Sequence, residues 1–324
     1  MTVQPRSNMQ PVCGRFAPTP SGRIHLGNIL CAMLSWLSVR SVGGRYLLRI
    51  EDLDAMRCPR SLADLIEDDL HWFGIDWDDG GSAGGEQWYQ SNRSGLYDIC
   101  YQQLEEQDLL YPCFCSRAEL HAAQAPHRSD GTYVYAGTCR SLTPEQIAEK
   151  RKRRPPATRV KVPDRVVSFT DGCQGQYTEN LAKDCGDFII RRSDGVYGYQ
   201  LAVVADDAAM GVTEVVRGRD LLESTPRQLY LYEKLGLQAP VFYHIPLLTA
   251  PDGRRLSKRD GDLDLGVLRE KFGRPEPIIG MLAAAIGLRP TAQPVTLQEL
   301  AADFSWDKVP KEDVALPEEI LRKA

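Results

Sequence analysis

The chain has 324 residues, of which 43% are hydrophobic and 26% are charged, a composition that is ordinary for a soluble globular protein. Its formal net charge of −5 at pH 7 argues against a protein coated in nucleic acid, while a local basic face stays compatible with it. No run of about 18 apolar residues occurs, and residues 1–11 lack the apolar core of a signal peptide, so we expect a cytoplasmic protein without a membrane span.

The first predicted elements are a strand over residues 12–17, a helix over 27–40 and a second strand over 45–50. Apolar side chains recur at helical spacing in the middle segment, whereas the two flanking segments are short apolar runs. Strand, helix and strand in this order predict a βαβ unit with a parallel sheet. Such sheets bind ligands beyond the carboxyl ends of their strands.

Residues 15–28, which join the first strand to the helix, form the first candidate site. Pro18 and Pro20 keep the backbone extended, while Gly22 and Gly27 allow a ligand to approach the main chain. The helix that follows directs unpaired N–H groups at this place, which suits a nucleotide phosphate. On composition alone, a plain Pro/Gly connection with a solvated histidine is an equally good interpretation.

Three carboxylates follow the second predicted strand, where parallel sheets place their ligands: Glu51, Asp52 and Asp54. For Asp52 and Asp54, the alternative is a helix N-cap with acidic residues in the first turn. Two amphipathic helices are predicted next, over residues 61–73 and 93–107. The Gly/Asp-rich residues 78–85 between these helices predict a surface connection.

Nine cysteines are spread over the chain. Only three of them form a tight group, Cys113, Cys115 and Cys139. This odd number and uneven distribution favour free thiols, with a metal at the tight group, over a disulfide framework. Three thiolates can bind Zn²⁺. From the spacing we propose His121 or His127 as the fourth ligand, with Tyr135 or water as less favoured choices. Three unligated cysteines are the alternative.

Residues 149–154 are basic except for Glu149. This run indicates either a contact with a phosphate backbone or the solvated end of a helix. Further strands are predicted within residues 159–171, 186–192, 197–204 and 213–217. The third of these runs into two carboxylates, Asp206 and Asp207. Arg217 ends the fourth strand, and its position after an apolar run predicts a buried anion partner.

The last third of the chain begins with a predicted helix over residues 225–235 and a strand over 241–245. A polar loop over 248–264 carries four cations, Arg254, Arg255, Lys258 and Arg259. The loop either closes over a triphosphate or is a mobile charged loop. Two helices are predicted within residues 265–287, and residues 289–324 predict a peripheral tail with one short helix.

Two stretches resemble known signatures. His25-Leu26-Gly27-Asn28 resembles the HIGH signature of class I aminoacyl-tRNA synthetases, and Leu256-Ser257-Lys258-Arg259 resembles their KMSKS loop. Asn28 stands where the first signature has its second histidine, and Arg255 and Leu256 stand at the first lysine and the methionine of the second. Because Asn28 can still donate a hydrogen bond to phosphate, we expect altered contact strength and retained activity.

Four stretches resemble the catalytic core of glutamyl-tRNA synthetases, residues 15–22, 48–54, 199–204 and 216–222. The resemblance covers roughly residues 12–290. The chain ends soon after the KMSKS-like loop and its helices, which leaves little room for an anticodon-binding domain. It therefore most resembles the glutamyl-Q tRNA(Asp) synthetase family, the truncated paralogues of glutamyl-tRNA synthetase.

This resemblance implies an α/β fold with the Rossmann-like parallel sheet of a class I synthetase, a zinc-binding insertion and a short helical C-terminal part. Residues 1–110 and 186–250 would be the two halves of the catalytic domain. Residues 111–185 would be the zinc-containing, acceptor-binding-like insertion. Residues 251–324 would hold the KMSKS-like loop and the helical C-terminal part, without an anticodon-binding domain.

The family's zinc site is written Cys-x-Cys, then Tyr-x-x-x-Cys. Cys113, Cys115, Tyr135 and Cys139 match it position by position. The resemblance thus implies one structural Zn²⁺ per chain and replaces a histidine by Tyr135 as the fourth ligand.

The implied activity is that of a ligase, which activates glutamate with ATP and Mg²⁺ and transfers it to the queuosine base of tRNA(Asp). We expect a monomer. The alternatives are a minimal glutamyl-tRNA synthetase that charges the 3′ end of tRNA(Glu), or a catalytically silent tRNA-binding paralogue. The implied catalytic residues are His25, Asn28 and Lys258, and the implied ATP-binding residues are Gly27, His25, Ser257 and Lys258. The implied glutamate-binding residues are Arg15, Phe16, Ala17, Pro18, Thr19, Glu51, Tyr199 and Arg217.

Overall fold

The computed structural model describes residues 11–116, 119, 134–253, 264–316 and 320. Its centre is a sheet of five strands in the order β10-β9-β1-β2-β3, in which all neighbours are parallel. The strands are β1 (Cys13–Phe16), β2 (Arg45–Leu48), β3 (Asp79–Gly80), β9 (Glu214–Gly218) and β10 (Val241–Ile245). The expected parallel α/β architecture is confirmed. Residues 78–85, predicted to be only a surface connection, contribute the edge strand β3.

Helix α1 (Leu26–Arg40) joins β1 to β2 and confirms the expected βαβ unit. Five of its apolar residues recur at helical spacing and are at most 1% exposed: Ile29, Leu30, Met33, Leu34 and Leu37. Because α1 is packed between the sheet and further helices, its start is held at the carboxyl end of β1. The connection between β1 and α1, residues 17–25, therefore begins at the carboxyl end of β1.

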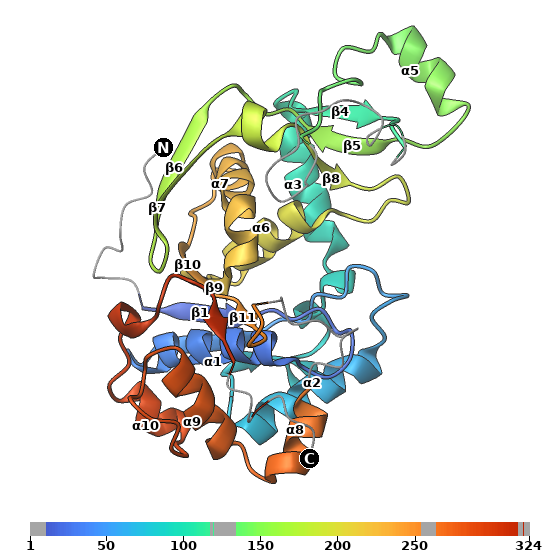
Figure 1. The fold of residues 1–324 in the computed structure, drawn as a ribbon. Helices are drawn as coiled ribbons and strands as arrows, with labels where there is room; N and C mark the ends of the chain where they lie inside the picture. Colours follow the sequence, from blue (N-terminus) through green and yellow to red (C-terminus); the bar gives the residue numbers. More distant parts are fainter. Residues whose placement is uncertain (1–10, 117–118, 120–133, 254–263, 317–319, 321–324) are drawn as a thin grey trace.

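Helices cover both faces of the sheet (Figure 1). Alternate strand residues enter two different cores, as strand geometry requires: Tyr46 and Leu48 pack with α1, and Leu47 packs on the opposite side. The α1 side holds α2 (Arg60–Phe73), α8 (Leu265–Phe272), α9 (Glu276–Ala285) and α10 (Leu297–Ala301). The other side holds α3 (Ser94–Glu106), α6 (Tyr199–Ala209) and α7 (Thr225–Lys234). Among the described helices, none has the length and apolar character needed to cross a membrane.

Two small antiparallel sheets flank the helices on this side, and the second of them reaches β10 (Figure 1). One contains β4 (Leu110–Cys113), β5 (Ala157–Val160) and β8 (Phe188–Arg191), and the other is the hairpin of β6 (Val166–Asp171) and β7 (Gly175–Asn180). Helix α5 (Pro144–Arg151) projects next to the first sheet. Residues 149–154, which are basic except for Glu149, are exposed at the end of this helix. Nζ of Lys152 lies 2.8 Å from Oε2 of Glu149, as expected for a solvated helix terminus.

The strand predicted over residues 197–204 is wrong, because residues 199–209 form helix α6. All residues from Leu201 to Asp207 are buried, so burial extends around every side of this part of the helix and its apolar residues show no helical periodicity. A short continuous apolar run fits a buried strand equally well. Asp206 and Asp207 therefore lie inside a buried helix and do not follow a strand.

The described part of residues 289–324 is also not the peripheral tail that the sequence predicted. Leu297, Leu300, Val309 and Leu316 are at most 7% exposed and belong to the same core as α1. Strand β12 (Val314–Ala315) pairs in parallel with β11 (Leu248–Thr249). Single apolar residues scattered among prolines and charges show no period, so only the tertiary structure identifies this packing.

Candidate functional site

A cavity of about 580 Å³ opens at the carboxyl ends of β1, β9 and β10. Because β1 lies between β2 and β9, the strand order reverses at this point, which is the usual ligand site of an open parallel sheet. Most residues implied by the resemblance line this one cavity: Arg15, Phe16, Ala17, Pro18, Thr19, His25, Gly27, Asn28, Glu51, Tyr199 and Arg217. Ser257 and Lys258 lie outside the described residues.

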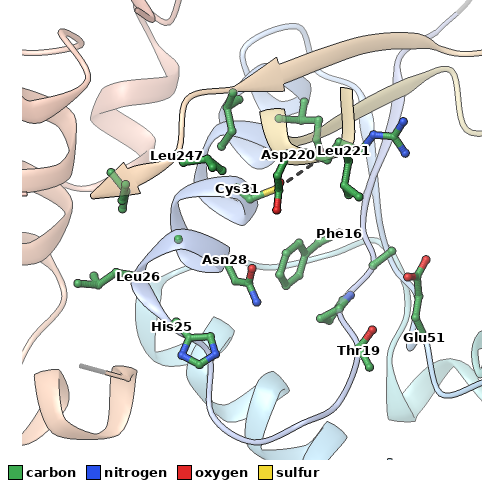
Figure 2. A pocket seen from close by; sticks show the side chains of 18 of the residues that line it. Phe16, Thr19, His25, Leu26, Asn28, Cys31, Glu51, Asp220, Leu221 and Leu247 are labelled. Carbon is green, nitrogen blue, oxygen red and sulfur yellow. Dashed lines mark hydrogen bonds between the residues drawn. The ribbon is translucent and has the colours of Figure 1, made fainter. Parts of the chain in front are cut away.

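The start of α1 forms one wall of the cavity. His25 precedes the helix in an extended conformation, and the first turn holds no acidic residue. Figure 2 shows His25 and Asn28 at this end of the helix, with Thr19 and Glu51 across the cavity from them. The first N–H groups of a helix have no partner within the helix and carry partial positive charge. This wall can therefore bind a phosphate group.

The chain that follows the KMSKS-like segment is anchored beside the first signature. Residues 254–263 lie outside the described part, and Asp264 is the next residue. Asp264 forms an isolated antiparallel bridge with His25, and the backbone nitrogen of Leu265 donates to the carbonyl oxygen of Ile24 at 2.9 Å. The chain from Asp264 onward, five positions after the second signature, is thus tied to the start of α1.

A buried ion-pair network lies behind the cavity. Arg49 is 0% exposed, and its Nη1 lies 2.6 Å from Oδ1 of Asp207. The Nε of Arg15 donates to the same oxygen at 3.3 Å. Burial alone would raise the pKa of the Asp207 carboxyl, but the two guanidinium groups hold it below its ordinary value. Asp207 therefore neutralises Arg15 from within the protein.

Arg49 also holds Glu51, because its Nη2 donates to Oε1 of that residue at 3.1 Å. Burial raises the pKa of Glu51 above its ordinary value, and Arg49 and Arg15 oppose the shift. Burial also raises the pKa of the Tyr199 phenol, so this hydroxyl is neutral at pH 7. Glu51 keeps acceptor sites toward the cavity, which suits an ammonium group. The sequence did not single out Arg49, whose partner lies 158 positions away.

Arg217 differs from Arg15 in its partners. It is 4% exposed, it lines the cavity, and its Nη1 has no hydrogen-bond partner among the described residues. Burial lowers the pKa of this guanidinium below its ordinary value, and the charge of Arg15 adds to the effect. The anion that the sequence predicted for Arg217 is thus not supplied at Nη1 by the described part of the protein.

Of the three carboxylates after β2, only Glu51 lines the cavity. Asp52 accepts hydrogen bonds from the backbone nitrogen and hydroxyl of Ser91 at 2.9 and 2.7 Å. Oδ2 of Asp54 lies 3.6 Å from Nε of Arg57 and 3.6 Å from Nη1 of Arg192. Asp52 and Asp54 therefore stabilise the connections around the site and do not form it.

The three grouped cysteines form a second candidate site. The sulfur atoms of Cys113, Cys115 and Cys139 lie within 4.8 Å of one another, and 3.6 Å separates those of Cys115 and Cys139. The phenol oxygen of Tyr135 lies 3.5 Å from the sulfur of Cys113 and 3.7 Å from that of Cys115. The cluster can hold a metal ion. His121 and His127, the first candidates for a fourth ligand, lie outside the described residues.

The spacing of these atoms fits zinc. Zinc bonds of about 2.3 Å to sulfur and about 2.0 Å to oxygen place tetrahedral ligand atoms about 3.5 to 3.8 Å apart. The guanidinium carbon of Arg159 lies 3.7 Å from the centre of the Tyr135 ring, and its Nε donates to the sulfur of Cys113 at 3.2 Å. Arg159, which the sequence did not single out, thus places a positive charge beside groups that bind metals as anions.

Comparison with known families agrees with this geometry. The family of tRNA synthetases class I (E and Q), catalytic domain, matches residues 11–322. The chain belongs to this family. Its resemblance to the class I synthetases, inferred above from two short signatures, is therefore confirmed over nearly the whole length.

Similar proteins narrow the relationship further. The chain is 48% identical to a protein of Symbiobacterium thermophilum named glutamyl-Q tRNA(Asp) synthetase, over 96% of this chain and 97% of that protein. A protein of Nitratidesulfovibrio vulgaris with the same name is 45% identical, over 95% of this chain and 96% of its own length. The fold is also similar to a glutamate tRNA ligase from Elizabethkingia meningosepticum in complex with its amino acid, with a TM-score of 0.82 and 30% identity, over 96% of this chain and 68% of that one.

Proposed function

We propose that the protein activates glutamate with ATP and transfers it to the queuosine base of tRNA(Asp). The observation that carries the amino-acid part is the contrast between two buried arginines in one cavity: Asp207 neutralises Arg15, whereas Nη1 of Arg217 has no partner among the described residues. The tRNA part rests on the similarity to proteins named glutamyl-Q tRNA(Asp) synthetase over nearly their whole length.

Glutamate presents one ammonium group and two carboxylates. Arg217 binds the side-chain carboxylate, and Glu51 accepts from the ammonium group while Arg49 holds it in place. Tyr199 supplies a neutral hydroxyl partner. Residues 16–19 complete the wall, with Thr19 facing the same space. A carboxylate satisfies the charge of Arg217, whereas the neutral amide of glutamine leaves that charge buried and unpaired, so the site selects glutamate.

ATP lies along the start of α1. His25 and Asn28 donate hydrogen bonds to the phosphates, the main chain at Gly27 allows their close approach, and Ser257 and Lys258 act from the KMSKS-like segment. Mg²⁺ accompanies ATP. An oxygen of the glutamate carboxylate that Arg217 does not bind attacks the α-phosphorus of ATP. This gives glutamyl-adenylate and releases pyrophosphate. Positioning and charge stabilisation carry the step, because it needs no covalent protein nucleophile.

In the second step, a hydroxyl of the queuosine base attacks the carbonyl carbon of glutamyl-adenylate. The new ester bond forms as the bond to AMP breaks, AMP leaves with the electron pair, and the proton of the hydroxyl is released to the solvent. The acceptor is part of a tRNA, so the reaction takes place in the cytoplasm. We propose that the enzyme acts as a monomer, in which one chain supplies the residues of both the cavity and the cysteine cluster.

Cys113, Cys115, Tyr135 and Cys139 hold one structural Zn²⁺. Four protein ligands leave no open position on the metal, so it does no chemistry. When bound, the ion would link the end of β4 to residues 135–139 and so stabilise the insertion over residues 111–185, which we propose faces the RNA. Residues 1–110 and 186–250 form the catalytic domain, and residues 251–324 carry the KMSKS-like loop and the C-terminal helices.

The test uses purified protein with ATP, labelled glutamate and three RNAs: tRNA(Asp) with queuosine, tRNA(Asp) without it, and tRNA(Glu). We expect glutamate-dependent exchange of pyrophosphate into ATP, and label on queuosine-containing tRNA(Asp) only. Charging of tRNA(Glu) alone would identify a minimal glutamyl-tRNA synthetase. Absence of exchange under all conditions would identify a protein that only binds tRNA.

A further inference from the structure

Arg217 is held from behind by two buried side chains. Its Nε donates to Nε2 of His244 at 2.9 Å, and its Nη2 donates to Oγ1 of Thr225 at 2.9 Å. His244 and Thr225 are each 0% exposed, and they come from β10 and α7, whereas Arg217 lies on β9. Its Nη1 is buried and has no hydrogen-bond partner among the described residues, and the Arg217 side chain lines the cavity, so both hydrogens of Nη1 can serve a ligand bound there.

The direction of the hydrogen bonds follows from chemistry. The Nε of arginine is always a donor, so Nε2 of His244 must be the acceptor and carry a lone pair. The proton of the neutral ring is then on Nδ1, which donates to Oδ2 of Asp171 at 2.5 Å. Burial lowers the pKa of His244 to about 4, so the ring is neutral at pH 7.

Asp171 is itself held in one orientation. Its Oδ1 accepts from three backbone nitrogens, those of Cys173, Gln174 and His244, at 3.0, 2.8 and 3.0 Å. Its Oδ2 is the atom that faces the imidazole. Although burial would raise the pKa of Asp171, the hydrogen bonds from His244 and the backbone lower it, so the residue is ionised at pH 7.

The use of a neutral ring has a consequence for specificity. A carboxylate in direct contact with Arg217 would neutralise it, as Asp207 neutralises Arg15. His244 instead accepts one hydrogen bond and adds no charge, while the negative charge of Asp171 lies on the far side of the ring. The guanidinium is therefore oriented, yet its charge remains available to a ligand.

We propose that Asp171 and His244 are specificity-determining positioning residues, which aim Nη1 of Arg217 at the side-chain carboxylate of the substrate and leave its charge uncompensated. This inference rests on the proposed function and deepens it. The pair acts through Arg217 and touches neither ATP nor the reacting atoms. Its loss therefore changes the KM for glutamate and the preference over glutamine, while the KM for ATP stays the same.

Two substitutions at one position separate orientation from simple structural support. In His244→Asn, the amide nitrogen can replace Nδ1 and donate to Asp171, but nothing accepts from Arg217. In His244→Gln, the longer side chain can place its amide oxygen near the position of Nε2 and accept from Arg217. We expect His244→Asn to raise the KM for glutamate about tenfold or more, and His244→Gln to restore it to within about threefold of the unsubstituted protein.

Asp171→Asn gives an independent test if the two His244 variants fold poorly. The three backbone N–H groups keep the amide oxygen at the position of Oδ1, so the amide nitrogen faces Nδ1 and donates to it. The imidazole proton must then move to Nε2, where it meets the N–H of Arg217. We expect the same selective rise in the KM for glutamate.

The measurements are glutamate-dependent pyrophosphate exchange, with KM values for glutamate and ATP, exchange with glutamine, and the thermal unfolding midpoint of each variant. A selective rise in the KM for glutamate and a weaker preference over glutamine support the inference. An unchanged KM for glutamate in His244→Asn and Asp171→Asn, or equal rises in both KM values, would overturn it. If the unsubstituted protein shows no glutamate-dependent exchange, the proposed function itself is wrong.

Discussion

Arg49 and Asp207 form an ion pair at the centre of the molecule, with 2.6 Å between Nη1 and Oδ1 and side chains that are 0% and 3% exposed. This pair joins two parts of the proposed glutamate site, because Asp207 also holds Arg15 and Arg49 also holds Glu51. A change at either residue therefore affects several substrate contacts together.

Asp207→Asn leaves two buried arginines without their shared anion. Breaking a buried pair on one side costs about 3 kcal/mol or more, and we expect this loss in the free energy of unfolding measured with urea. The KM for glutamate rises as well, because Arg15 and Arg49 lose the carboxylate that they share. Asp54→Asn is the control, since its partly exposed contacts at 3.6 Å are worth at most about 1 kcal/mol. Equal effects of the two substitutions would contradict this account.

The cost of Asp207→Asn depends on pH. The pKa of Asp207 is lower in the folded protein than the ordinary value, so its stabilisation is fully present above that value and is lost as the pH falls through the folded pKa. We expect the difference in unfolding free energy between the two proteins to be constant from about pH 7 to 5 and to shrink below about pH 4. A difference that grows in acid would show that the carboxylate is not the stabilising form.

Arg217→Ala removes the buried guanidinium group whose Nη1 has no hydrogen-bond partner among the described residues. We expect the KM for glutamate to rise about 100-fold or more, with the KM for ATP changed by less than about threefold, in the pyrophosphate exchange assay. Arg219→Ala is a matched control two positions away, because Arg219 pairs with Asp313 at 2.6 Å and does not line the cavity. Equal increases of both KM values in Arg217→Ala would reject its assignment to the side-chain carboxylate.

Tyr135→Phe tests the fourth zinc ligand. The substitution removes the phenol oxygen and keeps the ring beside Arg159, so the packing is preserved. We expect elemental analysis to find one zinc per chain in the unsubstituted protein, and the variant to lose zinc to a lower concentration of chelator. Tyr101→Phe removes a phenol oxygen that lies 3.2 Å from the Thr158 hydroxyl and is not among the metal-site atoms, so this variant should retain the metal normally. Absence of zinc from the unsubstituted protein would contradict the site.

The local signals in the sequence were sufficient to predict where the cavity lies. The βαβ unit follows from the period of its apolar residues, and parallel strands bring their carboxyl ends to one edge of the sheet. Glu51 and Arg217 were therefore expected at this edge, and both line the cavity. Their roles in binding glutamate stay predictions that the substitutions above test.

The partners behind the cavity could not be predicted in the same way. Arg49 meets Asp207 across 158 positions, and His244 meets Asp171 across 73, so no local pattern connects them. The strand wrongly predicted over residues 197–204 also misplaced Asp207, because a helix buried on all sides has no polar face to show its period. Tertiary packing alone identifies these contacts.

The most direct test of the proposed function is the position of the glutamyl group on the RNA. The protein is incubated with ATP, labelled glutamate and tRNA(Asp) that contains queuosine, and the RNA is then digested to nucleosides and separated. We predict that the label is attached to the queuosine nucleoside and that omission of ATP abolishes it. Label on the 3′-terminal adenosine, or incorporation into tRNA(Glu) alone, would contradict the proposal.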